Sequence, residues 1–172
     1  MIILTGYKEH GKDKACELLH QMFRMTSVSS SWYACETFLY DKLKERFGYT
    51  TIEECYEDRK HLRDIWFQEI YEYNREIPYR MADEIWQKYH IYNGLRNRKE
   101  FNGIIGKYPN VFVIWIDASK RKERESSSSM ELDVGDANYI LDNNGTINDL
   151  AVNCSRLWLY MRERNIIRSP FM

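Results

Sequence analysis

The residues from Gly6 to Asp13 combine two glycines, a lysine and a carboxylate in the order Gly-Tyr-Lys-Glu-His-Gly-Lys-Asp. Glycines let backbone N–H groups curl around an anion, and a lysine beside them can reach the outer phosphates of a bound nucleotide. An apolar stretch, 1–5, precedes these residues, and apolar residues at helical spacing follow them. Strand, loop and helix is the context that a phosphate-binding loop requires, because the helix N-terminus adds partial positive charge.

The last position of this motif is usually Ser or Thr, whose hydroxyl binds Mg²⁺. Here it is Asp13, whose carboxylate can hold Mg²⁺ through water, since Mg²⁺ keeps several waters in proteins. The alternative is that Asp13 only caps the following helix. The residues expected to contact a bound nucleotide in this segment are Gly6, Lys8, His10, Gly11, Lys12 and Asp13.

Asp117 directly follows a continuous apolar run, 111–116, which fits a strand buried on both faces of a parallel sheet. A carboxylate at the end of such a strand can coordinate the metal ion of a phosphate-binding enzyme. A turn cap is the alternative. Arg96 and Arg98 follow another predicted strand, 89–93, and can make bidentate contacts to a phosphate there. For the two arginines, a solvated basic helix start is the alternative.

Two further polar segments follow the last predicted strands. Arg121 and Arg124 belong to a charged, Ser-rich segment without periodicity, which predicts a mobile lid at about 118–132 that closes over the phosphates. The alternative for this segment is a solvated charged face. Asn143 and Gly145 lie in an Asn-Asn-Gly sequence that could frame an adenine ring, although a simple turn explains it almost as well.

Four more residues are candidates for contacting a second substrate. The stretch 26–31 predicts a strand, and Ser30 and Trp32 fall at its carboxyl end. Arg59 and Arg63 are four residues apart, which places them on one helical face. A surface ion-pair stripe is the alternative for these two arginines.

The alternation of predicted strands and helices indicates an α/β fold with a parallel sheet. In such sheets ligands bind at the carboxyl ends of the strands, and each polar segment described above falls at one. Strands are predicted over 1–5, 26–31, 89–93, 111–116 and 137–141. Helices are predicted over 12–25, 34–47, 57–73, 98–105 and 146–164, with shorter ones beginning at 51 and 78.

Composition restricts the kinds of partner. The 172 residues fit one domain, and the net charge of −1 provides no overall field to attract nucleic acid. No 18-residue apolar run predicts a membrane span, and a strand at Met1 leaves no room for a signal peptide. The cysteines at 16, 35, 55 and 154 are isolated in sequence, which argues against zinc and predicts buried free thiols in a reducing cytoplasm.

The loop with Asp in its last position resembles that of phage-type deoxynucleoside monophosphate kinases, a group of small P-loop kinases. Segments throughout the chain support the resemblance. Beside 6–13 they are 28–32, 54–59, 94–101, 115–119, 128–132 and 141–146.

This resemblance implies a three-layer P-loop kinase-like fold with a parallel sheet of about five strands in the order 2-3-1-4-5, and a helical acceptor-binding insertion at about 33–88. It implies an ATP- and Mg²⁺-dependent transfer of phosphate to a deoxynucleotide substrate, in the cytoplasm of an infected or lysogenic bacterial host. A homodimer is left open. Lys12, Arg121 and Arg124 would act on the transferring phosphate, and Asp13 and Asp117 on Mg²⁺. The acceptor would contact Ser30, Trp32, Arg59, Arg63, Arg96 and Arg98.

Two other functions stay open at this point. Related phage kinases phosphorylate 5-hydroxymethyluracil within modified DNA, although DNA binding usually requires a basic stripe, which the near-neutral charge does not favour. A non-catalytic nucleotide-binding regulator is the third possibility, because Asp13 departs from the usual Ser or Thr.

Overall fold

The strands form a single parallel sheet within the part of the chain that the structure, a computed structural model, describes, residues 1–123 and 130–167. The strand order is β2-β3-β1-β4-β5, and every neighbouring pair is parallel. The α/β class and the strand order predicted above are therefore confirmed. The strands are β1 (Ile2–Thr5), β2 (Ser27–Ser29), β3 (Ile91–Asn93), β4 (Phe112–Asp117) and β5 (Tyr139–Asp142).

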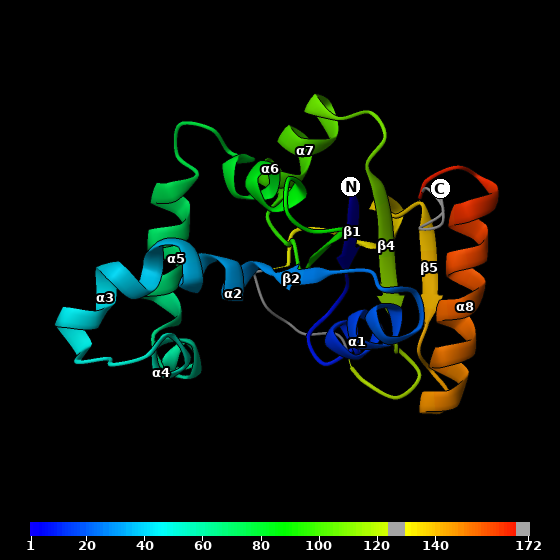
Figure 1. The fold of residues 1–172 in the computed structure, drawn as a ribbon, viewed down its shortest axis with the longest axis horizontal. Helices are drawn as coiled ribbons and strands as arrows, with labels where there is room; N and C mark the ends of the chain where they lie inside the picture. Colours follow the sequence, from blue (N-terminus) through cyan, green and yellow to red (C-terminus); the bar gives the residue numbers. More distant parts are fainter. Residues whose placement is uncertain (124–129, 168–172) are drawn as a thin grey trace.

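Helices cover both faces of the sheet, and a group of them extends outward beyond its β2 edge (Figure 1). The helices are α1 (Lys12–Phe23), α2 (Ser30–Ala34), α3 (Tyr40–Phe47), α4 (Ile52–Asp58), α5 (Arg63–Tyr73), α6 (Arg80–Trp86), α7 (Arg98–Lys107) and α8 (Ile147–Glu163), with a π-helical turn η1 (Cys35–Leu39) and a 3₁₀ turn η2 (Val134–Asp136). The chain passes through α2 to α6 between β2 and β3. These helices occupy the segment predicted to bind the acceptor.

Side chains of the central strand alternate between two apolar layers, as the period of a strand requires. Ile2 and Leu4 pack in one layer with Leu19 of α1 and the apolar face of α8. Ile3 packs in the other layer with Ile104 of α7 and with α2 and α6. Both faces of β1 are thus buried, which fixes the position of the loop that follows it.

The loops after β1, β3 and β4 meet at the carboxyl edge of the sheet, because β1 lies between the other two strands. The Thr5 hydroxyl donates a hydrogen bond of 2.8 Å to the Leu95 carbonyl. The Gly94 N–H donates one of 2.8 Å to the Leu4 carbonyl. These bonds attach the segment after β3 to the end of β1, so residues distant in sequence share one edge.

The prediction of one helix over 57–73 is wrong. α4 ends at Asp58 and α5 begins at Arg63. The Asp58 carboxylate accepts a hydrogen bond of 2.6 Å from the Tyr49 hydroxyl, and this bond holds the Asp58 side chain at the end of α4. Arg59 therefore lies in the turn between two helices, and the expectation that Arg59 and Arg63 share one helical face is also wrong.

The strand predicted over 26–31 is shorter than expected. β2 ends at Ser29, whose hydroxyl accepts a hydrogen bond of 3.1 Å from the Trp32 N–H and so caps α2. Ser is a strong N-cap residue because its side chain satisfies an N–H that the first turn leaves without a partner. Ser30 and Trp32 consequently lie in the first turn of a helix at the carboxyl edge of the sheet.

The cysteines belong to the apolar layers. All four are buried free thiols, as predicted. Burial raises the pKa of Cys16 to about 12, so that thiol stays protonated. Among residues 1–123 and 130–167, none of the helices has the length and apolar character needed to cross a bilayer.

Candidate functional site

The loop from Gly6 to Asp13 joins β1 to α1, and its two glycines lie where a side chain would not fit. Gly6 has a φ of 142°, and a Cβ there would lie 2.7 Å from the Ile116 carbonyl oxygen. Gly11 has a φ of 96°, and a Cβ there would lie 2.2 Å from the side-chain nitrogen of Asn143. Glycine permits both the positive φ and the close approach, so the loop lies directly against the ends of β4 and β5.

Lys12 begins α1 and turns back over the loop. Its Nζ donates hydrogen bonds to the carbonyls of Gly6, at 2.9 Å, and Tyr7, at 2.7 Å. The ammonium therefore lies over the loop at the N-terminal end of α1, where the helix dipole also contributes positive charge. Two positive features at one place favour the binding of an anion such as phosphate.

Asp13 lies in the first turn of α1 and contacts a residue that sequence reasoning missed. The Asn93 side-chain amide donates a hydrogen bond of 2.6 Å to Oδ1 of Asp13. Asn93 is the last residue of β3 and is 4% exposed, and its own Oδ1 is buried without a hydrogen-bond partner among the described residues. The N-cap of α1 is Gly11, so Asp13 does not cap the helix in the ordinary way.

These contacts test whether the site suits a metal ion. Mg²⁺ prefers oxygen ligands and usually takes only one or two protein carboxylates. Asp13 offers a carboxylate, and Asn93 offers a buried amide oxygen that has no hydrogen-bond partner within residues 1–123 and 130–167. The pair therefore fits a hydrated Mg²⁺ beside the loop. The only sequence signal for Asn93 was its place at the end of a predicted strand.

Asp117 ends β4, but its carboxylate is engaged by its own turn and by the next loop. It accepts hydrogen bonds from the Ser119 N–H at 3.1 Å, the Ser119 hydroxyl at 3.2 Å and the Asn144 amide at 3.0 Å. Burial alone would raise the pKa of Asp117, but these hydrogen bonds outweigh it and lower the pKa below its usual value. This geometry favours the turn-cap alternative, and the metal role stays a prediction.

His10 and Asn143, both predicted to contact nucleotide, support the loop from behind. His10 is fully buried, and its Nδ1 accepts a hydrogen bond of 3.1 Å from the Ala118 N–H. The Asn143 amide donates one of 2.8 Å to the His10 carbonyl, and the Asn143 N–H donates one of 2.7 Å to the Asp117 carbonyl. The ends of β4 and β5 therefore hold the back of the loop in place.

Other predicted nucleotide contacts lie around this support. Lys8 is exposed, 3.9 Å from Glu9. Arg121 donates a hydrogen bond of 2.5 Å to the Asn143 carbonyl, which places this part of the predicted lid beside the loop. Gly145 lies in the exposed turn before α8. Arg124 and the rest of the segment 124–129 lie outside the described residues.

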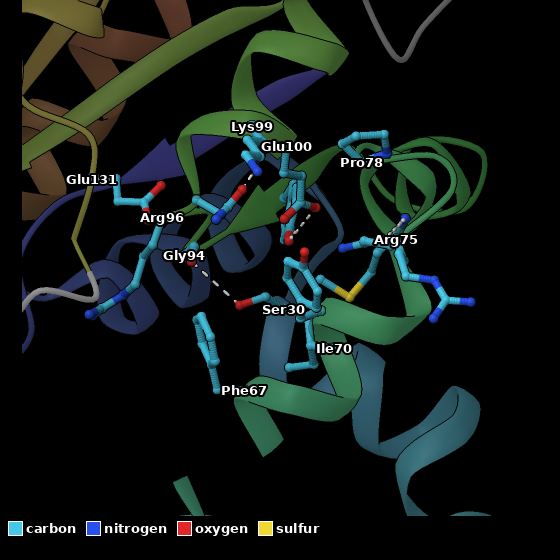
Figure 2. Close-up of a pocket in the computed structure, with 15 residues that line it drawn as sticks. Ser30, Phe67, Ile70, Arg75, Pro78, Gly94, Arg96, Lys99, Glu100 and Glu131 are labelled. Carbon is cyan, nitrogen blue, oxygen red and sulfur yellow. Dashed lines mark hydrogen bonds between the residues drawn. The ribbon is translucent and has the colours of Figure 1, made fainter. Parts of the chain in front are cut away.

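A cavity of about 300 Å³ opens beside the loop after β3, and we call it the Arg96 pocket. Arg96 and Ser30, both predicted to bind the acceptor, line it. Figure 2 shows Arg96 and Arg75 on opposite sides of the pocket. The rest of the lining combines apolar and aromatic residues with five polar or charged ones. Its other members are Phe67, Ile70, Tyr71, Asn74, Pro78, Met81, Tyr92, Gly94, Asn97, Lys99, Glu100 and Glu131.

A second, more open cavity of about 540 Å³ is lined by residues of β2 and α1. Trp32 lines it together with Asp13, Asn93 and Tyr56. The Trp32 and Tyr56 rings meet edge to face with centroids 4.9 Å apart. Trp32 is therefore placed near Asp13 rather than in the Arg96 pocket.

The other predicted acceptor arginines lie outside the Arg96 pocket. Arg98 forms a two-pronged ion pair with Asp136, at 2.5 and 2.8 Å, and also donates to the Glu131 carbonyl. Arg59 lies 3.7 Å from the centre of the Tyr56 ring and donates to the Tyr56 carbonyl. Arg63 is exposed at the start of α5. Among these arginines and Arg96, only Arg96 lines the pocket.

Comparison with solved structures identifies the fold. Dephospho-CoA kinase from Campylobacter jejuni matches with a TM-score of 0.50 and 13% identity, over 95% of this chain and 98% of that one. Shikimate kinase from Bacteroides thetaiotaomicron matches with a TM-score of 0.50 and 13% identity, over 94% and 97%. Shikimate kinase from Aquifex aeolicus matches with a TM-score of 0.50 and 12% identity, over 95% and 97%. The chain therefore has the fold of small P-loop kinases.

Comparison of the sequence with known families and proteins does not identify a particular kind of kinase. No protein-family model matches the chain, and no curated protein matches it significantly. At identities of 12 to 13%, the structural likeness establishes the fold and leaves the reaction to be argued from the site.

Proposed function

We propose that this protein is an ATP- and Mg²⁺-dependent phosphotransferase that moves the γ-phosphate of ATP to a deoxynucleoside monophosphate. The observation that carries the proposal is the placement of Lys12 and the glycine loop at the same sheet edge as the Arg96 pocket. One side of this arrangement suits a triphosphate, and the other suits an acceptor that carries a phosphate of its own.

The donor side needs no covalent chemistry from the protein, because phosphoryl transfer depends on positioning and charge stabilisation. The loop N–H groups and Lys12 would hold the ATP phosphates. Asp13 and Asn93 would hold the hydrated Mg²⁺, which screens the phosphate charge when bound. Arg121 would approach from the lid side, next to the Asn143 carbonyl that it contacts here.

The acceptor side is supported by the lining of the Arg96 pocket. A volume of about 300 Å³ is at the small end of the range for ligand sites, which suits a mononucleotide. Arg96 can bind the acceptor phosphate with the two-pronged geometry of a guanidinium. Phe67 and Tyr71 are 62% and 49% exposed, so their rings remain available to a base. The phage-type setting of the proposal rests on the loop resemblance.

The test is incubation with γ-labelled ATP and a panel of acceptors: the four deoxynucleoside monophosphates, modified deoxynucleotides, and DNA that contains 5-hydroxymethyluracil. Labelled deoxynucleoside diphosphate is the expected product. Label in DNA alone would favour the DNA kinase, and ATP binding without transfer to any acceptor would favour a non-catalytic regulator. Lys12→Ala serves as the blank.

A further inference from the structure

The second cavity, which we call the α1 cavity, differs in charge from the Arg96 pocket. Asp13 and Glu17 of α1 line it, and within residues 1–123 and 130–167 no lysine or arginine does. The lining of the Arg96 pocket, in contrast, contains two arginines and a lysine. A cavity of about 540 Å³ with two carboxylates and no cationic side chain in its described wall favours a positively charged ligand.

A buried acceptor in the wall of the α1 cavity lacks a donor. Asn93 is 4% exposed, and its Oδ1 has no hydrogen-bond partner among the described residues. The orientation of this amide is fixed, because its nitrogen donates to Oδ1 of Asp13 at 2.6 Å and an ionised carboxylate has no proton to give in return. A buried oxygen without a donor costs stability, so a ligand that brings N–H groups would complete the site.

Aromatic rings form much of the remaining wall. Trp32, Tyr56 and Tyr89 line the α1 cavity. The Arg59 guanidinium lies 3.7 Å from the centre of the Tyr56 ring, so a cation already occupies one face of that ring. The Trp32 ring meets Tyr56 edge to face and lies directly beside the two carboxylate-bearing turns of α1 in the same lining. Tryptophan is the side chain that attracts an alkylammonium group most strongly.

Glu17 has partners at the protein surface that do not fill the cavity. Its carboxylate lies 2.8 Å from Nζ of Lys14 and accepts a hydrogen bond of 3.0 Å from the Gln21 amide. Neither partner lines the α1 cavity. Exposed ion pairs of this kind contribute little to stability, so a ligand ammonium can share or replace the Lys14 contact.

We propose that the α1 cavity binds a linear aliphatic polyamine. Asp13 and Glu17 are one helical turn apart, so their Cβ atoms are about 6 Å apart, a separation that a short methylene chain spans. One ammonium would contact Asp13 and the Asn93 oxygen, a second would contact Glu17, and the methylene chain would lie against the Trp32 ring. This inference goes beyond the proposed function. Because the first ammonium takes the position proposed for hydrated Mg²⁺, polyamine and metal ion exclude each other there.

The experiment is a calorimetric titration of the protein without nucleotide or Mg²⁺. It compares putrescine, a diamine, with butylamine, its monoamine counterpart. Putrescine should bind at least about tenfold more tightly, because only the diamine reaches both carboxylates. Glu17→Gln should lower the affinity for putrescine to that for butylamine and leave the binding of ATP with Mg²⁺ unchanged. Excess Mg²⁺, at matched ionic strength, should weaken the binding of putrescine to wild type.

Asp41→Asn is the matched control. Like Glu17, Asp41 is a carboxylate paired with a lysine three residues away, Lys44 at 2.6 Å, but it does not line the α1 cavity. This variant should bind putrescine as wild type does.

Four results would each overturn the inference. Putrescine binds no better than butylamine, Glu17→Gln keeps the wild-type affinity, Asp41→Asn loses as much affinity as Glu17→Gln, or excess Mg²⁺ has no effect. Because these titrations need neither an acceptor nor transfer, their outcome is independent of the proposed kinase reaction.

Discussion

Replacing Asn93 by Asp gives a direct test of the proposed metal site. The substitution places a second carboxylate where an amide now donates to Asp13 at 2.6 Å. Two unit charges about 4 Å apart repel by about 1 kcal/mol in water and about 4 kcal/mol near a protein surface. Because Asp13 is exposed while Asn93 is buried, we take about 2 kcal/mol. For a chain of this size, that lowers the melting temperature by roughly 4–8 °C.

A divalent cation between the two carboxylates would cancel this repulsion. Mg²⁺ should therefore raise the melting temperature of Asn93→Asp by most of the lost amount, while wild type without nucleotide responds much less. Scanning calorimetry at pH 8 with and without Mg²⁺ measures the effect. Asp13→Ser combined with Asn93→Asp should recover the wild-type melting temperature without Mg²⁺, because it restores a single carboxylate.

Asp117→Asn is the matched control for the Asn93 experiment. It neutralises the competing metal candidate and keeps the size of the side chain that caps the turn. We expect its Mg²⁺ half-saturation for nucleotide binding to equal that of wild type. Two results together would refute the reasoning: a melting temperature of Asn93→Asp that does not respond to Mg²⁺, and weakened Mg²⁺ binding in Asp117→Asn. They would indicate that Asp117 binds the metal ion.

Three further predictions concern the loop, the acceptor pocket and the buried acid. Lys12→Ala should lower kcat by about 10²-fold, equivalent to about 3 kcal/mol, in labelled-ATP assays, whereas Lys14→Ala should stay near wild type. Arg96→Ala should raise the acceptor KM; Arg98→Ala should cost about 1 kcal/mol of stability through its lost ion pair and leave that KM unchanged. The native protein binds more protons than the unfolded chain between pH 4.5 and about 7, because burial raises the pKa of Glu100 to about 7. Its free energy of unfolding should therefore fall across that interval, by at most about 3 kcal/mol, and urea titrations of Glu100→Gln should lack this component; identical pH profiles for the two proteins would contradict it.

The sequence by itself determined the features that depend on neighbouring residues. The glycine loop, the strand before it and the helix after it form one contiguous segment, whose geometry follows from glycine conformation and apolar spacing. The buried strand 112–117 was visible as a continuous apolar run for the same reason. From these elements the α/β class and the edge of the sheet that bears the polar residues could be predicted.

The tertiary structure decided which polar groups meet. Asn93 contacts Asp13 across 80 positions because β3 pairs with β1, and no local pattern encodes that pairing. Arg98 pairs with Asp136, 38 positions away, and does not line the pocket. Arg96, two residues earlier, does line it. Sequence spacing fixes which residues share an element; a contact between elements depends on packing, because strand order and loop path set the distances.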